Sequence, residues 1–204
     1  SLAGAVQKVY PAGFKAFDRV AGKHAASGLH GICEGQLIFL TGDPGAGKST
    51  LLGRVCYELA RRGMRALYVS GEESVYDIAA RMAREKTRHP RVIILATNSW
   101  EEVEREIQRS NPHVVIVDSL SRMGTMHGGP EGSAAAMQAV IHRTAQLSKH
   151  HKWPKGVFRP CFIIIQHINK KGQARGEVSL GHDVDTLMHL HRDDDRNVSE
   201  LRST

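Results

Sequence analysis

A glycine-rich run near the start of the chain carries residue types that bind nucleotide phosphates. The pattern G-x-x-x-x-G-K-[S/T] is matched at Gly42, Gly47, Lys48 and Ser49. Glycines let the backbone turn its N–H groups toward phosphates, and a helix that follows adds its positive N-terminal end. The lysine reaches the outer phosphates and the serine hydroxyl binds Mg²⁺. We therefore predict a site for ATP and Mg²⁺, a glycine turn without a ligand being the alternative. The predicted ATP contacts are Gly42, Asp43, Pro44, Gly45, Ala46, Gly47, Lys48, Ser49 and Thr50, together called the phosphate loop.

An acidic residue ends a later apolar run. Asp118 directly follows the four apolar residues at 114–117. A phosphate loop usually works with an acid at the end of a neighbouring strand, which positions Mg²⁺ through water. We therefore predict that Asp118 and Ser49 form the metal site. A helix-capping or turn aspartate is the simpler alternative.

Two further strand ends carry polar side chains. Glu72 and Glu73 follow the apolar run that ends at Ser70, and a carboxylate there could orient or deprotonate the attacking water. Acids are also favoured at an exposed helix N-terminus, so the residues alone leave both interpretations open. Gln166 and His167 follow the run at 162–165 and could sense the γ-phosphate, or simply close a strand.

The elements that must position these residues alternate regularly along the chain. Short, wholly apolar segments indicate buried strands, and the segments between them have helical spacing. Such alternation predicts an α/β fold with a mainly parallel sheet and helices on both faces. The predicted strands are 36–41, 66–70, 92–95, 114–117, 162–165 and 186–190, the last being the final strand, and the predicted helices are 49–62, 74–85, 99–109 and about 133–150. We expect residues 1–34 to be a loose lead-in with a short helix near 14–21, and 35–204 to be the core.

Composition narrows the class of protein. The chain has 204 residues, a length typical of one domain. Its three cysteines stand singly with no C-x-x-C pair, which argues against a zinc ribbon and favours free thiols in a reducing cytoplasm. No apolar run reaches the length of a membrane span. The net charge of +7 favours polyanionic partners such as nucleic acid.

Two histidines near the end of the chain could bind a metal. His189 and His191 lie on one face of the last predicted strand, close to Asp193, Asp194 and Asp195. A strand running into an acidic turn is the simpler interpretation.

Several motifs occur together in one order, and with them the sequence resembles the ATPase domain of the RadA (Sms) family, bacterial relatives of RecA. The matching stretches begin with the phosphate loop and its Leu51-Leu52 extension. They continue with Leu67-Tyr68-Val69-Ser70-Gly71-Glu72-Glu73-Ser74, Val115-Ile116-Val117-Asp118-Ser119, His167-Ile168-Asn169-Lys170-Lys171-Gly172 and His182-Asp183-Val184-Asp185-Thr186. Gln166 departs from the family, which usually has glycine there.

The resemblance implies a RecA-like P-loop core that hydrolyses ATP, with Glu72 as the catalytic acid. From their positions in the sequence we count Lys48, Gln166 and His167 with the predicted catalytic residues. It also implies a hexameric ring that binds single-stranded DNA through central loops at about 121–133 and 169–181, and a role in branch migration during recombinational repair. The second loop carries Lys170, Lys171 and Arg175, which would contact DNA phosphates unless the loop is simply solvated.

The family's other parts lie outside these 204 residues. Its zinc finger and protease-like domain are not present, and its Lys-Asn-Arg-Phe-Gly motif, expected to act across the subunit interface, would begin just after Thr204. A second hypothesis therefore stays open: a RecA-fold ATPase, like a replicative helicase or KaiC, whose partner is mainly protein.

Overall fold

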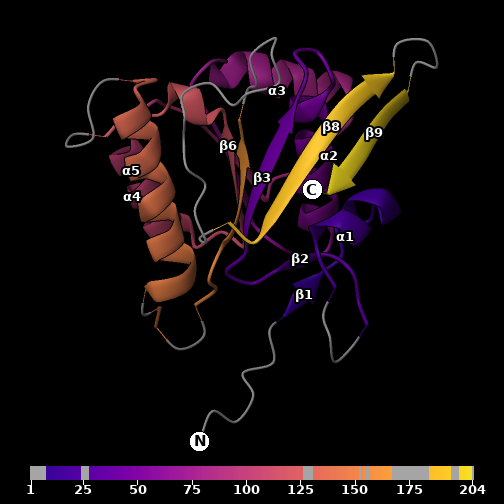
Figure 1. Ribbon diagram of the computed structural model, residues 1–204, viewed down its shortest axis with the longest axis horizontal. Helices are drawn as coiled ribbons and strands as arrows, with labels where there is room; N and C mark the ends of the chain where they lie inside the picture. The colour runs from indigo at the N-terminus through magenta and orange to yellow at the C-terminus, as the bar shows by residue number, and fades with distance from the viewer. Residues whose placement is uncertain are drawn as a thin grey trace, which may run out of the picture.

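A seven-stranded sheet forms the centre of the molecule (Figure 1). The structure is a computed structural model that describes residues 8–23, 28–125, 131–151, 153–154, 157–166, 184–193 and 198–203. The strands are β3 (Leu37–Gly42), β4 (Ala66–Ser70), β5 (Val92–Ala96), β6 (Val114–Asp118), β7 (Cys161–Ile165), β8 (Thr186–Asp193) and β9 (Val198–Ser203). Their order is β5-β4-β6-β7-β3-β8-β9, and every neighbouring pair is parallel except β8 and β9. The predicted α/β fold with a mainly parallel sheet is thereby confirmed.

Helices connect the strands, and three of the described helices begin at a serine cap. The helices are α1 (Lys15–Ala21), α2 (Lys48–Arg61), α3 (Val75–Arg84), α4 (Trp100–Ser110) and α5 (Ala134–Ala145), with a 3₁₀ turn at Leu120–Arg122 and a π-helical turn at Gln146–His150. Ser74, Ser99 and Ser133 each accept a hydrogen bond from the backbone N–H three residues on, which satisfies a donor that the helix itself leaves unpaired. A small antiparallel sheet pairs β1 (Val9–Tyr10) with β2 (Ile32–Cys33).

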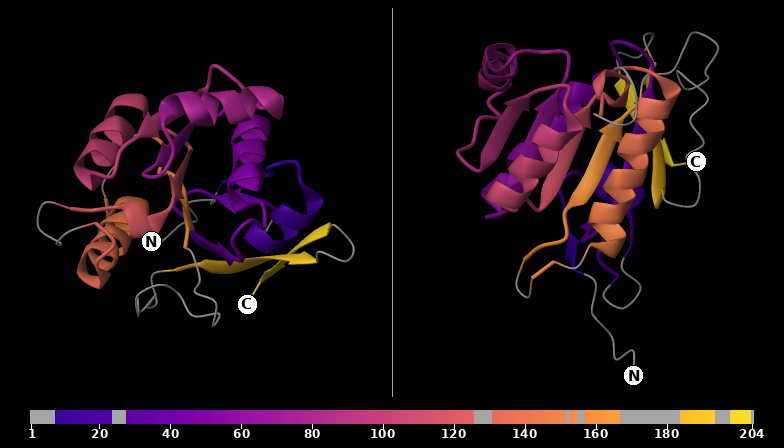
Figure 2. Two further views of the ribbon diagram at one scale, coloured as in Figure 1. Left: turned by 90° about the horizontal axis from the view of Figure 1, so that it is seen from above. Right: turned by 90° about the vertical axis from the view of Figure 1, so that its left-hand side faces the viewer.

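Different helices cover the two faces of the sheet. Alternate strand residues point to opposite faces, so Ile38 and Tyr68 pack with α1, α2 and α3, whereas Phe39 and Val69 pack with α4 and α5. Seen from above, the helices lie in layers on either side of the strands (Figure 2). Wholly apolar strands such as β7 are explained by this two-sided cover, since side chains on both faces are buried.

The structure corrects two expectations. The segment 186–190 is not the final strand, because β9 follows it antiparallel at the sheet edge. In β9, Leu201 packs on the core while Glu200 and Arg202 pair with each other, so this edge strand has no continuous apolar run to reveal it. The described part of residues 1–34 is also not loose: α1 contacts β8 and β9, and Phe17 is 1% exposed. A domain boundary at residue 35 stays a prediction.

Within the described ranges, we find no helix with both the length and the apolar character that crossing a membrane requires.

Replacing Phe17 tests whether α1 is part of the core. Phe17→Ala is expected to lower the free energy of unfolding by about 3–5 kcal/mol, because it removes a buried aromatic side chain and leaves a cavity. The matched control is Lys15→Ala on the exposed side of the same helix, which should change stability by less than about 0.5 kcal/mol. Denaturant unfolding measures both. Equal effects in the two variants would show that α1 is not integral to the core.

Candidate functional site

The candidate residues converge because parallel strands end at the same edge of the sheet. Ser70, at the end of β4, pairs in register with Asp118, at the end of β6. β7 lies between β6 and β3, which places Gln166 between Asp118 and the phosphate loop. Open α/β sheets bind ligands at this carboxyl edge, where loops from several strands meet.

The phosphate loop has the backbone shape that its sequence predicts. Gly45 and Gly47 have positive φ angles of 77° and 92°, which favour glycine. A Cβ added at either position would meet no described atom within 4 Å, so this side of the loop is open. Gly47 is the N-cap of α2 and offers no side chain to the first N–H groups of that helix. The open loop and these donors fit a phosphate group.

The Lys48 side chain folds back onto the backbone of the phosphate loop. Its ammonium group donates 2.8 Å hydrogen bonds to the carbonyl oxygens of Gly42 and Asp43, and the residue is 5% exposed. Burial lowers the pKa of Lys48, while the carboxylates of Asp118, Asp43 and Glu72 act in the opposite direction. The loop thus carries a buried cation at its centre, which complements a polyphosphate.

Asp118 joins the loop to two strands. Its Oδ2 atom accepts hydrogen bonds of 2.6 Å from the Ser49 hydroxyl and 2.6 Å from the Tyr68 hydroxyl, and the residue is 6% exposed. Carboxylate and hydroxyl oxygens are the ligand types that Mg²⁺ prefers. The two predicted metal ligands are therefore in direct contact, and their chemistry fits the ion.

Arg81, which no sequence pattern indicated, contacts both of the residues that donate to Asp118. Arg81 on α3 is 11% exposed, and its guanidinium bonds to both carboxylate oxygens of Glu73, with the shorter distance 2.7 Å. It also donates to the Tyr68 hydroxyl at 3.4 Å and to the Ser49 carbonyl at 3.2 Å. Nothing distinguished Arg81 in the sequence. Tyr68 gave one weak signal, a hydroxyl within an apolar run.

Glu72 and Glu73 have different surroundings although they are adjacent. The backbone N–H groups of both bond to the Ser70 hydroxyl at 3.2 and 3.0 Å, which fixes the turn after β4. Glu73 turns toward Arg81, whereas the Glu72 carboxylate accepts 2.9 Å from the Ser119 hydroxyl and lies 3.6 Å from Arg122. Glu72 therefore faces the end of β6, beside the predicted Mg²⁺ ligand.

The remaining predicted residues lie partly beyond what the structure describes. Gln166 is 1% exposed, and its backbone N–H donates to the Leu40 carbonyl at 3.0 Å. His167 and the predicted DNA contacts Lys170, Lys171 and Arg175 fall outside the described residues.

Comparison with known proteins places this geometry in a family. The family described as "AAA domain" matches residues 24–173. The DNA repair protein RadA of Mycolicibacterium smegmatis is 35% identical over 203 residues, covering 99% of this chain and 41% of that protein. RadA of Bacillus subtilis is 35% identical, covering 85% of this chain and 36% of that protein, and RadA of Escherichia coli is 31% identical, covering 95% and 39%. The chain thus spans about two fifths of the length of these relatives.

A solved structure gives the fold. The crystal structure of a KaiC-like protein from the archaeon Pyrococcus horikoshii superposes with a TM-score of 0.69, over 97% of this chain and 87% of that one. Sequence identity is 17%, so the likeness concerns the fold alone: a RecA-like core.

Removing one hydroxyl tests the Asp118 contact. Tyr68→Phe is expected to weaken Mg²⁺-dependent nucleotide binding about tenfold, because Asp118 loses a donor that orients it, a loss worth about 1–2 kcal/mol. Binding measured in EDTA should change little. The matched control, Tyr57→Phe on α2, removes a hydroxyl away from Asp118, and titration calorimetry compares the two. Equal weakening with and without Mg²⁺ would contradict the proposed role of this bond.

Proposed function

This chain belongs to the AAA domain family, and from its RadA-like, RecA-fold ATPase core we propose that it hydrolyses Mg²⁺-ATP to drive a DNA transaction in repair. The observation that carries the proposal is the convergence of Lys48, Ser49, Asp118 and Glu72 at one edge of the sheet. We take ATP and Mg²⁺ as its cofactors and the cytoplasm as its compartment.

Each residue of this group has one chemical task in the proposal. Lys48 exchanges its two carbonyl partners for oxygens of the outer phosphates, so that a preformed cation meets the negative charge of the transition state. Ser49 and Asp118 hold Mg²⁺ beside those phosphates. Phosphoryl transfer depends mainly on such positioning and charge stabilisation.

Glu72 is the acid we assign to the attacking water. Glu73 is bound through both oxygens to the largely buried Arg81, and breaking that pair would leave an uncompensated charge. Glu72 is held by a hydroxyl and a more exposed arginine. The two side chains are similarly exposed, at 38% for Glu72 and 36% for Glu73, so it is the looser pairing of Glu72 that favours it for this role. Gln166, buried between β6 and the phosphate loop, is positioned to report the state of the γ-phosphate to the residues that follow it.

DNA is the partner class that we assign. The net charge of +7 and three basic residues in one predicted loop, Lys170, Lys171 and Arg175, support contacts with phosphates. RadA relatives are named as DNA repair proteins. We further propose a hexameric ring in which a neighbouring subunit completes each ATP site. The alternative is a RecA-fold ATPase whose partner is mainly protein, and the DNA experiment below distinguishes the two.

Glu72→Gln separates binding from chemistry. This variant should bind ATP as the wild type does, while the rate of hydrolysis falls by about 10²- to 10⁴-fold, because the general base is lost. Glu73→Gln is the matched comparison, and it should lower stability through Arg81 rather than abolish turnover in the folded protein. Single-turnover phosphate release measures both. Full activity in Glu72→Gln would move the role elsewhere.

Salt dependence tests the DNA assignment. Single-stranded DNA should raise ATP turnover, and its affinity should fall steeply with salt because bound phosphates release counterions. Each of Lys170→Ala, Lys171→Ala and Arg175→Ala should reduce the slope of log affinity against log salt by about 0.7. Lys15→Ala on α1 is the control and should leave the slope unchanged. An ATPase unaffected by DNA would favour a protein partner instead.

A further inference from the structure

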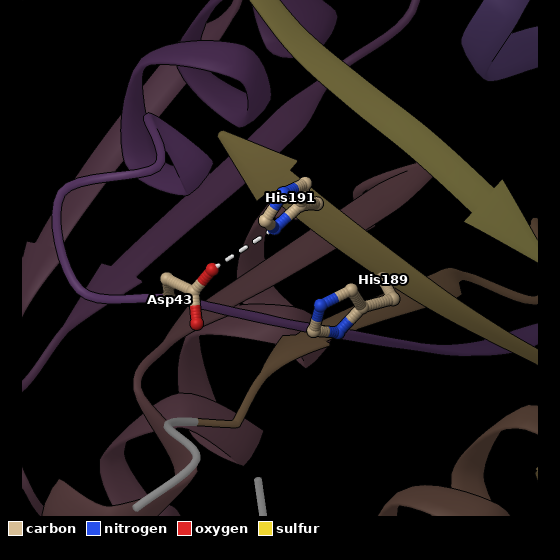
Figure 3. Close-up of side chains that lie close together, drawn as sticks. All are labelled: Asp43, His189 and His191. Carbon is tan, nitrogen blue, oxygen red and sulfur yellow. Dashed lines mark hydrogen bonds and ion pairs between the residues drawn. The ribbon is translucent and has the colours of Figure 1, made fainter. Parts of the chain in front are cut away.

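Three metal-binding side chains from two distant parts of the chain meet beside the phosphate loop. Asp43, His189 and His191 each offer one ligand atom, and these atoms all lie within 4.8 Å of one another. In Figure 3 the two imidazole rings and the carboxylate face a common space between the loop and β8. The side chains of the aspartates at 193–195, which the sequence suggested as partners for the histidines, lie outside what the structure describes. Among the described residues, the carboxylate of the group comes from the phosphate loop.

Strand register explains why these residues meet. β3 and β8 are parallel, with Thr41 opposite His189 and Gly42 opposite Leu190. His189 and His191 are two residues apart and so share one face of β8, while Leu190 is buried on the other. The strands approach closely because residue 42 is glycine: a Cβ there would lie 2.2 Å from the Leu190 carbonyl oxygen. The residue that follows Gly42 is thereby brought alongside His191.

Hydrogen bonding prepares one ring nitrogen of His189 for a metal. The Thr41 hydroxyl contacts the Met188 carbonyl at 3.0 Å and His189 Nδ1 at 3.1 Å. A carbonyl can only accept, so Thr41 donates to Met188 and must accept from His189. The proton of a neutral His189 ring is therefore on Nδ1, which leaves the lone pair of Nε2 available. Metal-binding histidines usually have this arrangement, with the second nitrogen donating to an outer partner.

An ordinary ion pair accounts for only part of the group. His191 Nδ1 lies 3.3 Å from Asp43 Oδ2, which a simple histidine–aspartate contact would explain. It does not explain a second imidazole whose tautomer is set and whose ligand atom lies in the same small space. Both Asp43 and His191 have side chains that are 49% exposed, so an ion can enter from solvent.

We propose that Asp43, His189 and His191 bind a divalent transition-metal ion such as Zn²⁺. Two imidazoles and one carboxylate form a ligand set known for Zn²⁺, with a fourth tetrahedral position left for water. Mg²⁺ prefers an all-oxygen, octahedral set and is not the ion of this site. The ion ties the phosphate loop to β8. Because Lys48 also holds the Asp43 carbonyl, the ion restrains the part of the loop that the lysine occupies.

The test uses the 204-residue chain, freed of metal with EDTA and without nucleotide or Mg²⁺. Calorimetric titration with Zn²⁺, and with Co²⁺ as a spectroscopic probe, should show one tight site and the visible absorption of four-coordinate Co²⁺. Zn²⁺ should raise the melting temperature, since an ion that binds only the folded state stabilises it. Excess Mg²⁺ should not displace Co²⁺.

Variants assign the ligands. His191→Gln should lower Zn²⁺ affinity by more than about 100-fold, because loss of an outer partner alone costs about 10- to 100-fold. Thr41→Val removes the hydroxyl that accepts a hydrogen bond from His189, and it should lower Zn²⁺ affinity by only about 10- to 100-fold. The chain has 12 histidines, so the control is His142→Gln on α5, which should bind Zn²⁺ as the wild type does.

The site is disproved if Zn²⁺ binding survives the double variant His189→Gln with His191→Gln, or if His142→Gln lowers it equally. Binding that appears only when ATP is present would also overturn the proposal, because the ion would then belong to the nucleotide. Since binding is measured without ATP, failure of this proposal leaves the proposed ATPase activity untouched. Failure of the ATPase assay likewise leaves this site untouched.

Discussion

The candidate site depends on one buried carboxylate. Asp118 is 6% exposed, and an ion that is removed from water requires hydrogen-bond donors around it. Ser49 and Tyr68 supply two at 2.6 Å, and each belongs to a different element, α2 and β4. Arg81 extends the network to α3 and to Glu73. These contacts join the phosphate loop, two strands and two helices in one arrangement.

The phosphate loop takes part in two separate groups of side chains because of where β3 lies in the sheet. On one side, beyond β7, is β6 with Asp118, and on the other side is β8 with its histidines. Ser49 faces the first group and Asp43 the second. Lys48 connects them, since it binds the carbonyl of Asp43 and lies in the field of the Asp118 carboxylate. A substitution near Asp118 and a substitution near the two histidines can therefore both affect the backbone of the phosphate loop.

Apolar runs and helical spacing in the sequence predicted much of the fold. The features that they did not predict, β9 and the packing of α1, share one cause. Apolar runs located β3, β4, β6 and β7 because both faces of those strands are buried. They also located β5 and β8, which are partly buried. β9 escaped notice since it is an edge strand with a polar face, which leaves no apolar run. α1 was expected near residues 14–21 and is there, yet its packing on β8 and β9 involves partners about 170 residues away. Short-range periodicity carries no information about such contacts.

The sequence by itself determined the chemistry of the phosphate loop, because glycine spacing, lysine and serine act within nine consecutive residues and need only their own backbone. It also placed Glu72 and Asp118 at strand ends. The resemblance pointed to Glu72 as the acid, and the tertiary structure adds that its neighbour Glu73 is paired with Arg81. Only the tertiary structure supplied Asp43 as the partner of His189 and His191. The meeting of Asp43 with the two histidines rests on the register of β3 and β8, which brings together side chains almost 150 residues apart, a proximity that no linear spacing encodes.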